Sequence, residues 1–291
     1  MNRWTPLGVA LLAMMALSGC LVSEVNPPAG AGTLRYRDEV FPSITTTSSL
    51  TYGSAPRLDG QPVALKLDLH QPTGDTATVR PAIVYVHGGG FSSGTRSEGA
   101  SLMAPMVRRG FVVVSISYRL LAPAGCNGTS TGTACSDAAY AAMDDARAAV
   151  RWLRANAATY RIDTSRIAIE GYSAGGVTAT GVGLMPEEPG SSGNPGHSST
   201  VRAWVSIAGG LPDGTGATPG DPPGYLFSGT ADPTVPHQWS VDTAQALHEA
   251  GGFAVLKPKV GGGHGLPDMT MVAQQTANFY YLTMNLGSSP T

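Results

Sequence analysis

The chain has 291 residues, of which 42% are hydrophobic and 13% are charged, and its formal net charge is −2. This composition is that of a globular protein rather than a disordered one, and the length permits one large α/β domain without forcing two. Because the chain has no Lys/Arg-rich patch, nothing in it indicates nucleic acid as a partner.

The amino terminus predicts an export signal over residues 1–19. Asn2-Arg3 supplies one positive charge, the apolar stretch 7–17 follows, and small residues precede Cys20. A stretch of this length is typical of a cleaved secretory signal rather than of a permanent transmembrane helix. The residues Leu17-Ser18-Gly19-Cys20 also resemble the bacterial lipobox, in which the cysteine becomes the lipidated first residue of the mature protein.

We therefore expect a lipoprotein of the bacterial cell envelope, in the outer membrane or facing the periplasm, that is held to the membrane through Cys20. Plain secretion is the alternative. Residues 20–33 include Asn26-Pro27-Pro28 and several glycines, which predict a flexible tether. The catalytic domain would then comprise residues 34–291.

The predicted elements begin with strands and continue as alternating strands and helices. Residues 43–52 and 63–70 are alternating or β-branched stretches, which predict strands rather than a helical cap. Residues 137–160 show apolar side chains near helical spacing. Further on, continuous apolar runs predict strands buried on both faces, over residues 82–86, 111–118, 166–170, 203–208, 225–229 and 254–260. This alternation predicts a mainly parallel sheet with helices on both faces.

Ser173 is the candidate nucleophile. It lies in Gly171-Tyr172-Ser173-Ala174-Gly175, which follows the apolar run 166–170 directly. A serine at a sharp strand-to-helix turn has its hydroxyl exposed above the sheet, and the flanking glycines leave room for the tight approach of neighbouring elements. Tyr172, next to the candidate nucleophile, fits a packing role as well as a role in lining an acyl or sugar pocket.

A glycine run at the end of another strand predicts an oxyanion hole. His87-Gly88-Gly89-Gly90-Phe91 follows the run 82–86, and backbone N–H groups in such a loop can point at one spot. Gly88 and Gly89 would supply two donors and Ala174 a third. His87 would be structural. An ordinary flexible turn is the alternative for the glycine run taken alone.

Asp232 and His264 are the candidate partners of Ser173. Asp232 follows the strand-like residues 225–229, and His264 follows the next strand-like stretch, so that the chain order is Ser, Asp, His. His264 would take the proton from Ser173, and Asp232 would orient the imidazole. Asp213 is the alternative acid. The remaining histidines fit surface or packing roles; these are His70, His197, His237 and His248.

Two cysteines besides Cys20 predict a disulfide. Cys126 and Cys135 flank a Gly/Thr/Ser-rich loop, and an exported protein is in an oxidising compartment. A short loop closed in this way would contribute about 2–3 kcal/mol to stability. No His/Cys cluster with zinc-site spacing is present, and the chemistry expected here requires no metal or organic cofactor.

These features together resemble the bacterial α/β-hydrolase carboxylesterases, the group with a His-Gly-Gly-Gly loop that includes hormone-sensitive-lipase-like esterases and carbohydrate-ester hydrolases. The resemblance implies the α/β-hydrolase fold and the catalytic roles given above. It also implies that Arg119 and Asp145 brace the loops around the site. The alternative is that Asp145 is a surface charge and Arg119 a buried salt-bridge partner. The matching stretches are residues 87–91, 117–120, 145–154, 163–176, 229–236 and 263–265.

The function that follows is a serine ester hydrolase acting through an acyl-enzyme on short-acyl esters, including acetyl or feruloyl esters of polysaccharides. Two alternatives remain at this point. One is a serine peptidase of the prolyl-oligopeptidase type, which shares the catalytic core, and the other is a catalytically silent, lipid-anchored binding module. The sequence does not indicate an oligomeric state.

Overall fold

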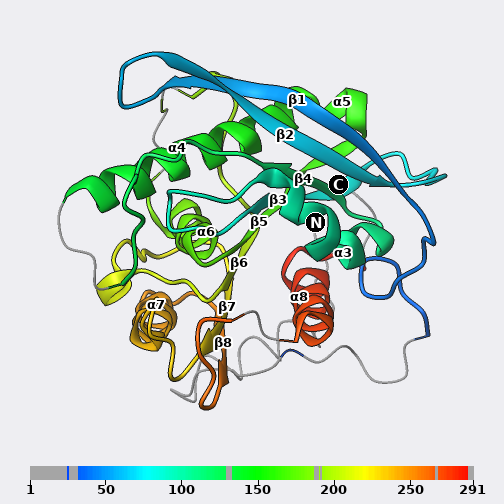
Figure 1. Ribbon diagram of the computed structural model, residues 1–291. Helices are drawn as coiled ribbons and strands as arrows, with labels where there is room; N and C mark the ends of the chain where they lie inside the picture. The colour runs from blue at the N-terminus through cyan, green and yellow to red at the C-terminus, as the bar shows by residue number, and fades with distance from the viewer. Residues whose placement is uncertain are drawn as a thin grey trace.

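The computed structural model describes Val25 and residues 32–128, 133–186, 190, 192–265 and 268–287. Within these residues one sheet of eight strands has the order β1-β2-β4-β3-β5-β6-β7-β8 (Figure 1). The strands are β1 (Ile44–Pro56), β2 (Pro62–Pro72), β3 (Arg80–Val86), β4 (Val112–Ile116), β5 (Ile162–Tyr172), β6 (Ala203–Ile207), β7 (Gly224–Gly229) and β8 (Ala254–Lys259).

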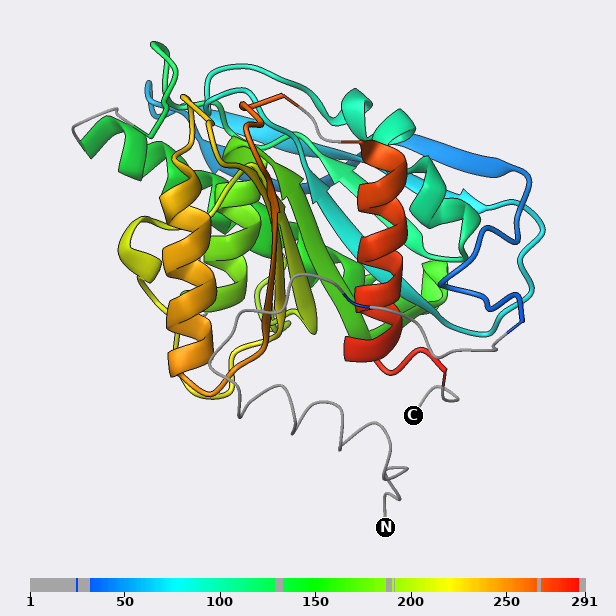
Figure 2. The ribbon, with the colours of Figure 1, turned by 90° about the horizontal axis from the view of Figure 1, so that it is seen from below.

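The sheet is parallel from β4 to β8 and antiparallel where β1, β2 and β4 pair. The predicted mainly parallel architecture is thus confirmed. In Figure 2 the parallel strands run upward to the edge at which α7 and α8 begin. Because the carboxyl ends of parallel strands meet at one edge, the loops after β3, β5, β7 and β8 are gathered there.

Helices cover both faces of the sheet (Figures 1 and 2). The helices α4, α6 and α7 lie on one face, and α3 and α8 lie on the other. The helical elements are η1 (Arg96–Glu98), α2 (Gly99–Leu102), α3 (Ala104–Arg108), α4 (Thr133–Ala155), α5 (Ala157–Tyr160), α6 (Ala174–Leu184), η2 (Pro212–Gly214), α7 (His237–Glu249) and α8 (Met269–Thr283).

The central strands divide their side chains between two cores. In β3, Val84 and Val86 pack into the core beneath α4 and α6, whereas Ile83 and Tyr85 pack into the core beneath α3 and α8. All seven residues of β3 are buried. A strand with helices on both faces has no solvent side, which is why its sequence is a continuous apolar run rather than an alternating one.

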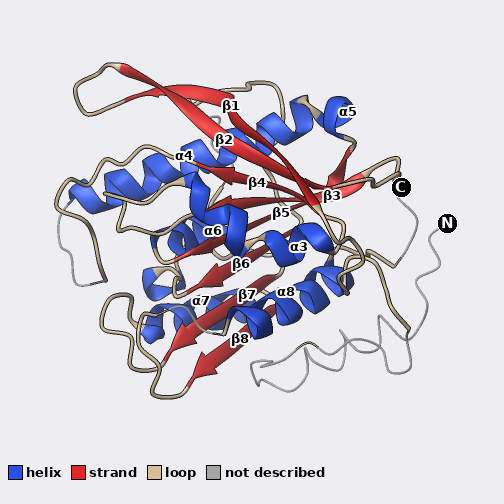
Figure 3. Cartoon of the chain, turned by 45° about the vertical axis from the view of Figure 1, so that its right-hand side comes forward, coloured by secondary structure: helices blue, strands red, loops and turns tan. Residues whose placement is uncertain are grey.

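A long antiparallel hairpin, β1–β2, forms one edge of the sheet, and β8 forms the other (Figure 3). The hairpin confirms the strands predicted in this region. Its register shifts twice, between Thr47 and Leu50 and between Thr51 and Gly53. No helical cap is built from residues 32–72, so the described part of this segment leaves the carboxyl edge of the sheet uncovered.

The predicted helix over residues 137–160 differs from the observed one. Helix α4 begins earlier, at Thr133, and ends at Ala155, after which α5 forms a separate turn. Asn156 stands at the break with φ −108° and ψ 17°, and its side-chain amide donates to Trp152 O at 2.9 Å. The backbone N–H of Asn156 also donates to Trp152 O, at 3.0 Å, so both groups of Asn156 satisfy a carbonyl in the last turn of α4.

Residues 1–24 and 26–31 contain the predicted signal sequence, Cys20 and most of the predicted tether, and they lie outside the described residues. Among the helices that are described, none is both long enough and apolar enough to cross a membrane.

Candidate active site

Ser173 lies in a tight turn between β5 and α6. Its backbone has φ 55° and ψ −121°, and its N–H donates to Ile207 O at 2.8 Å. A Cβ on Gly171 would overlap the carbonyl of Gly175, and a Cβ on Gly175 would overlap the carbonyl of Val86. Both glycines are therefore required by close backbone approach, as the sequence predicted, and the turn is held in a strained conformation by its surroundings.

Ser173, His264 and Asp232 form a continuous hydrogen-bonded chain. Ser173 Oγ lies 2.8 Å from His264 Nε2, and His264 Nδ1 lies 2.8 Å from Asp232 Oδ2. Because an ionised carboxylate only accepts, Nδ1 carries the proton and Nε2 is left to accept from the serine hydroxyl. The structure thus brings together the three residues that the sequence proposed as a triad.

The carboxylate of Asp232 is fixed from its own turn. Its Oδ1 accepts from the N–H groups of Thr234 at 2.8 Å and Val235 at 3.0 Å. The Asp232 side chain is fully buried, whereas 20% of the His264 side chain is exposed. The alternative acid, Asp213, lies in η2 against α7, and His264 pairs with Asp232 instead.

Tyr172 positions the histidine loop, a role that the sequence did not reveal. Its hydroxyl donates to the backbone oxygen of His264 at 2.6 Å, and the two rings lie 5.5 Å apart. Burial raises the pKa of Tyr172, so the phenol keeps the proton that this hydrogen bond needs. The position of Tyr172 next to Ser173 was the signal in the sequence that could have indicated this role.

The glycine loop after β3 lies beside the nucleophile. A Cβ on Gly88 would come within 3.2 Å of Ser173 Cβ. Gly89 has φ +109°, a backbone conformation in which a residue with a side chain would be strained. The carbonyl of Gly89 accepts from the N–H groups of Ser92 at 3.0 Å and Ser93 at 3.1 Å. Among the described residues, no acceptor faces the N–H groups of Gly88, Gly89 or Ala174. Two of these N–H groups lie on Gly88 and Ala174, next to Ser173, and the third lies on Gly89, the residue after Gly88.

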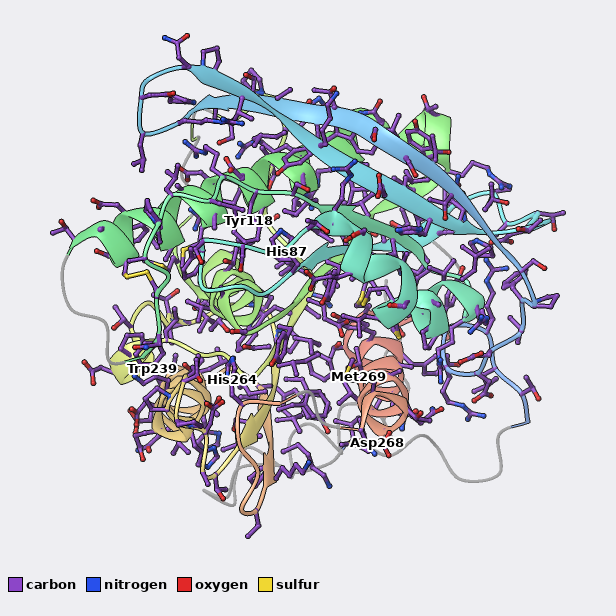
Figure 4. The ribbon with its side chains drawn as sticks, in the orientation of Figure 1. His87, Tyr118, Trp239, His264, Asp268 and Met269 are labelled. Atoms are coloured by element: carbon purple, nitrogen blue, oxygen red, sulfur yellow. A yellow bond between two sulfur atoms is a disulfide. The ribbon has the colours of Figure 1, made fainter. Side chains whose placement is uncertain are left out.

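His87 is part of the loop's support. Its ring is buried and stacks on Tyr118 with 4.4 Å between ring centroids (Figure 4). The Tyr118 hydroxyl donates to His87 O at 3.1 Å, and His87 Nδ1 lies 2.7 Å from Gly88 O. Burial lowers the pKa of His87, which keeps the ring neutral. Figure 4 also shows His264 on the loop that precedes α8, which is a different part of the site.

Arg119 and Asp145 form a buried ion pair, so the interpretation of Asp145 as a surface charge is wrong. The Asp145 side chain is fully buried, and its Oδ1 lies 2.9 Å from Arg119 Nη2. Asp145 Oδ2 accepts from the backbone N–H of Arg119 at 2.8 Å, and the Ser192 hydroxyl donates to Oδ1 at 2.6 Å. Burial raises the pKa of Asp145, and Arg119 opposes this shift. The pair ties the segment after β4 to α4.

The predicted disulfide between Cys126 and Cys135 is confirmed, with 5.8 Å between the two Cα atoms. It joins the segment after β4 to the first turn of α4. Across the residues that the structure describes, no group of three or more His, Cys, Asp and Glu side chains is arranged to hold a metal ion.

The fold and the site together define an α/β-hydrolase. The sheet is mainly parallel, the serine turn follows β5, the aspartate follows β7 and the histidine follows β8. This is the order and placement of the nucleophile, acid and histidine in that fold.

Comparisons with known proteins agree with this class. The family model described as BD-FAE matches residues 67–205. Esterase B1 of Culex pipiens is 29% identical over 161 residues, which are 50% of this chain and 29% of that protein. Carboxylesterase NlhH of Mycobacterium tuberculosis is 39% identical over 101 residues, which are 33% of this chain and 26% of that protein. The chain thus spans less than a third of the length of these two relatives.

A solved structure of Thermogutta terrifontis esterase 2, phosphorylated by paraoxon, has a TM-score of 0.67 and 25% sequence identity. The match covers 84% of this chain and 95% of that one. The same esterase with butyrate bound has a TM-score of 0.67 and 24% identity, and covers 87% of this chain and 98% of that one. The comparisons support the α/β-hydrolase fold.

Proposed function

We propose that this protein is a serine carboxylic-ester hydrolase that acts through an acyl-enzyme on short-acyl esters. The observation that carries the proposal is the chain Ser173–His264–Asp232, with 2.8 Å at each hydrogen bond, next to three backbone N–H groups that have no acceptor among the described residues. A nucleophile, a base and a set of anion donors are the parts that acyl transfer requires.

In the first half-reaction Ser173 Oγ attacks the ester carbonyl carbon while His264 Nε2 accepts the hydroxyl proton. The N–H groups of Gly88, Gly89 and Ala174 donate to the oxyanion of the tetrahedral intermediate. Asp232, fixed by two backbone N–H groups, stabilises the imidazolium. The intermediate collapses, the alcohol leaves with the proton from His264, and the acyl group stays on Ser173.

In the second half-reaction water replaces the alcohol. His264 accepts a proton from the water as its oxygen attacks the acyl carbonyl, and the same three N–H groups stabilise the second intermediate. The carboxylic acid then leaves and Ser173 recovers its proton. No step calls on groups beyond the residues already described.

Two observations support a short acyl group on a larger alcohol or polymer. The esterase of similar fold from Thermogutta terrifontis has been solved with butyrate bound, and a carbohydrate esterase from gut microbiota shares the fold with a TM-score of 0.66 and 23% identity. The described residues place no helical cap over the site, and His264 is partly exposed. An uncapped site suits acetyl or feruloyl esters carried by polysaccharides.

We also propose that residues 1–19 direct export and that Cys20 becomes a lipid anchor in the bacterial cell envelope, with the catalytic domain beginning near residue 34. The lipobox-like residues before Cys20 support this. Membrane fractionation of bacteria expressing the wild type and Cys20→Ser tests it. The wild type should sediment with membranes and the variant should not. Equal partitioning of the two would contradict the anchor.

Hydrolysis of p-nitrophenyl esters from acetate to palmitate tests the ester hydrolase proposal. We expect the highest kcat/KM on acetate to butyrate, and a loss of at least about 10⁴-fold in kcat for Ser173→Ala, since a triad nucleophile carries most of the catalysis. The melting temperature of the variant should stay that of the wild type.

A fluorophosphonate probe separates the alternatives. A folded protein that reacts with the probe at Ser173 and hydrolyses no ester would favour a peptidase. A protein that neither reacts nor hydrolyses would be a binding module.

A further inference from the structure

A segment that we call the disulfide loop, residues 122–128, lies between two parts of the site that come from different strands. On one side it binds the glycine loop after β3. The N–H of Cys126 donates to Gly90 O at 2.9 Å, and the N–H of Ala122 donates to Phe91 O at 3.1 Å. Gly90 has φ +58°, and a Cβ there would come within 3.0 Å of Cys126 O. The loop therefore packs closely on the glycine loop that carries two of the proposed oxyanion donors.

On the other side the disulfide loop binds the turn of the triad acid. The N–H of Gly128 donates to Thr234 O at 2.6 Å, and the N–H of Thr234 donates to Asp232 Oδ1 at 2.8 Å. A Cβ on Gly128 would overlap the ring of Pro236. A short path of hydrogen bonds thus joins the disulfide loop to the carboxylate that holds His264.

The disulfide loop is itself anchored to α4 at two points. Before the loop, Arg119 forms the buried ion pair with Asp145 of α4 and donates to Ala141 O at 3.2 Å. Within the loop, Cys126 is bonded to Cys135 of α4. Helix α4 is long and packs on the central sheet, which makes it a rigid base.

We propose that the Cys126–Cys135 disulfide is a positioning element of the active site, which holds the oxyanion loop and the turn of Asp232 in fixed relation to each other. The proposal rests on the proposed function, because it takes both parts as working parts of one catalytic site. Cys126 and Gly128 bond the two parts from positions two residues apart, so a shift of this short segment moves both of them.

The expected consequence is a loss of rate with little loss of substrate binding. The donors and the triad acid act on the transition state, and a misplacement of about 1 Å can cost on the order of 100-fold. The fold has a second attachment of the loop to α4 through Arg119 and Asp145, so breaking the S–S bond should leave the domain folded.

Reduction of the folded wild type by dithiothreitol is the first test. The reagent transfers two electrons and two protons, so the S–S bond becomes two thiols and the reagent closes to its own cyclic disulfide. We expect kcat on p-nitrophenyl acetate and the rate constant for fluorophosphonate labelling of Ser173 both to fall about tenfold or more, with KM changed by less than about twofold. Circular dichroism at the assay temperature verifies that the reduced protein stays folded.

The control is Cys126→Ser/Cys135→Ser, which should start at the lowered rates and not respond to dithiothreitol. Cys20 is present in both proteins, so any effect of the reagent at Cys20 cancels. Gly128→Ala is a second variant that keeps the disulfide and pushes on the turn of Asp232; it should also lower kcat and the labelling rate. Gly32→Ala is its matched control, because a Cβ at Gly32 meets nothing within 4 Å.

Unchanged kcat and labelling rate after complete reduction of a folded wild type would overturn the proposal. So would a Gly128→Ala variant that matches Gly32→Ala in both rates. If the wild type labels at Ser173 but hydrolyses no ester, the proposed function fails, while the labelling rates still decide the role of the disulfide.

Discussion

The turn of the nucleophile and the turn of the histidine are both rich in glycine, yet they use it differently. Beside Ser173, side chains at Gly171 and Gly175 would overlap backbone oxygens, whereas beside His264, side chains at Gly263 and Gly265 would meet nothing within 4 Å. The nucleophile follows a strand buried in the middle of the sheet, and the histidine follows the strand at the edge. Close packing together with one backbone hydrogen bond therefore fixes the serine, whereas side-chain hydrogen bonds from Tyr172 and Asp232 hold the histidine.

The two turns should therefore respond differently to substitutions. A turn fixed by packing tolerates no added volume, because the overlapping atoms belong to backbone that cannot rotate away. A turn fixed by hydrogen bonds tolerates added volume but depends on its partners, here the Tyr172 hydroxyl, which donates, and the carboxylate of Asp232, which accepts.

The largest effect is expected for Gly175→Ala. The new methyl group must displace the carbonyl of Val86 or the nucleophile turn itself. Kcat/KM on p-nitrophenyl acetate should fall at least about 100-fold, because Ser173 would leave its attack geometry. A variant with wild-type activity would show that packing does not fix the serine.

A second effect concerns Glu170, which is buried in the nucleophile strand between Tyr85 of β3 and Val205 of β6. Burial raises its pKa from an ordinary 4.5 to about 8. Below pH 4.5 the carboxyl is protonated in both the folded and the unfolded chain. Between pH 4.5 and about 8 the unfolded chain loses this proton and the folded chain keeps it, so the stability contribution is lost as the pH rises.

Glu170→Gln should remove that dependence. The free energy of unfolding of the wild type, relative to the variant, should decrease between pH 5 and pH 8 by up to a few kcal/mol. Urea unfolding of both proteins at these two pH values measures it. Parallel changes in the two proteins would mean that Glu170 ionises normally.

A smaller effect is expected for Tyr172→Phe, which removes the hydrogen bond to His264 O and keeps the ring. The loss of about 1 kcal/mol expected for one such hydrogen bond corresponds to roughly a fivefold decrease in kcat. Tyr140→Phe is the matched control, since Tyr140 is 52% exposed on α4. If the two variants have equal kcat, the histidine loop does not depend on Tyr172.

The smallest effect is expected for Gly263→Ala, directly before His264. Its Cβ has open space, so kcat should stay within about twofold of the wild type, as for a surface substitution. A loss as large as that of Gly175→Ala would remove the distinction between the two turns.

Much of the fold could be predicted because buried parallel strands have continuous apolar sequences and each strand end carries a chemically distinct residue. Residues 82–86 and 225–229 illustrate the first point, and Ser173, Asp232 and His264 the second. The disulfide could also be predicted, because Cys126 and Cys135 are close in sequence and flank a Gly/Thr/Ser-rich loop.

The remaining features depend on tertiary contacts. Asp145 lies on a helix with many charged neighbours, and its burial follows from Arg119 and Ser192, which come from other segments. The break after α4 is a local change of backbone angles at Asn156, with φ −108° and ψ 17°. That Gly128 meets the turn of Thr234 depends on how two loops pack. No periodicity in the sequence records such contacts.

The role of Ser173 as the nucleophile is tested most directly by trapping the acyl group. The protein is mixed with p-nitrophenyl acetate, quenched in acid within the first turnover and digested, and the peptides are mapped by mass spectrometry. We expect one acetyl group on Ser173 in the wild type, and no adduct on that peptide in Ser173→Ala. An acetyl group on another residue, or steady turnover by the Ser173→Ala protein, would contradict it.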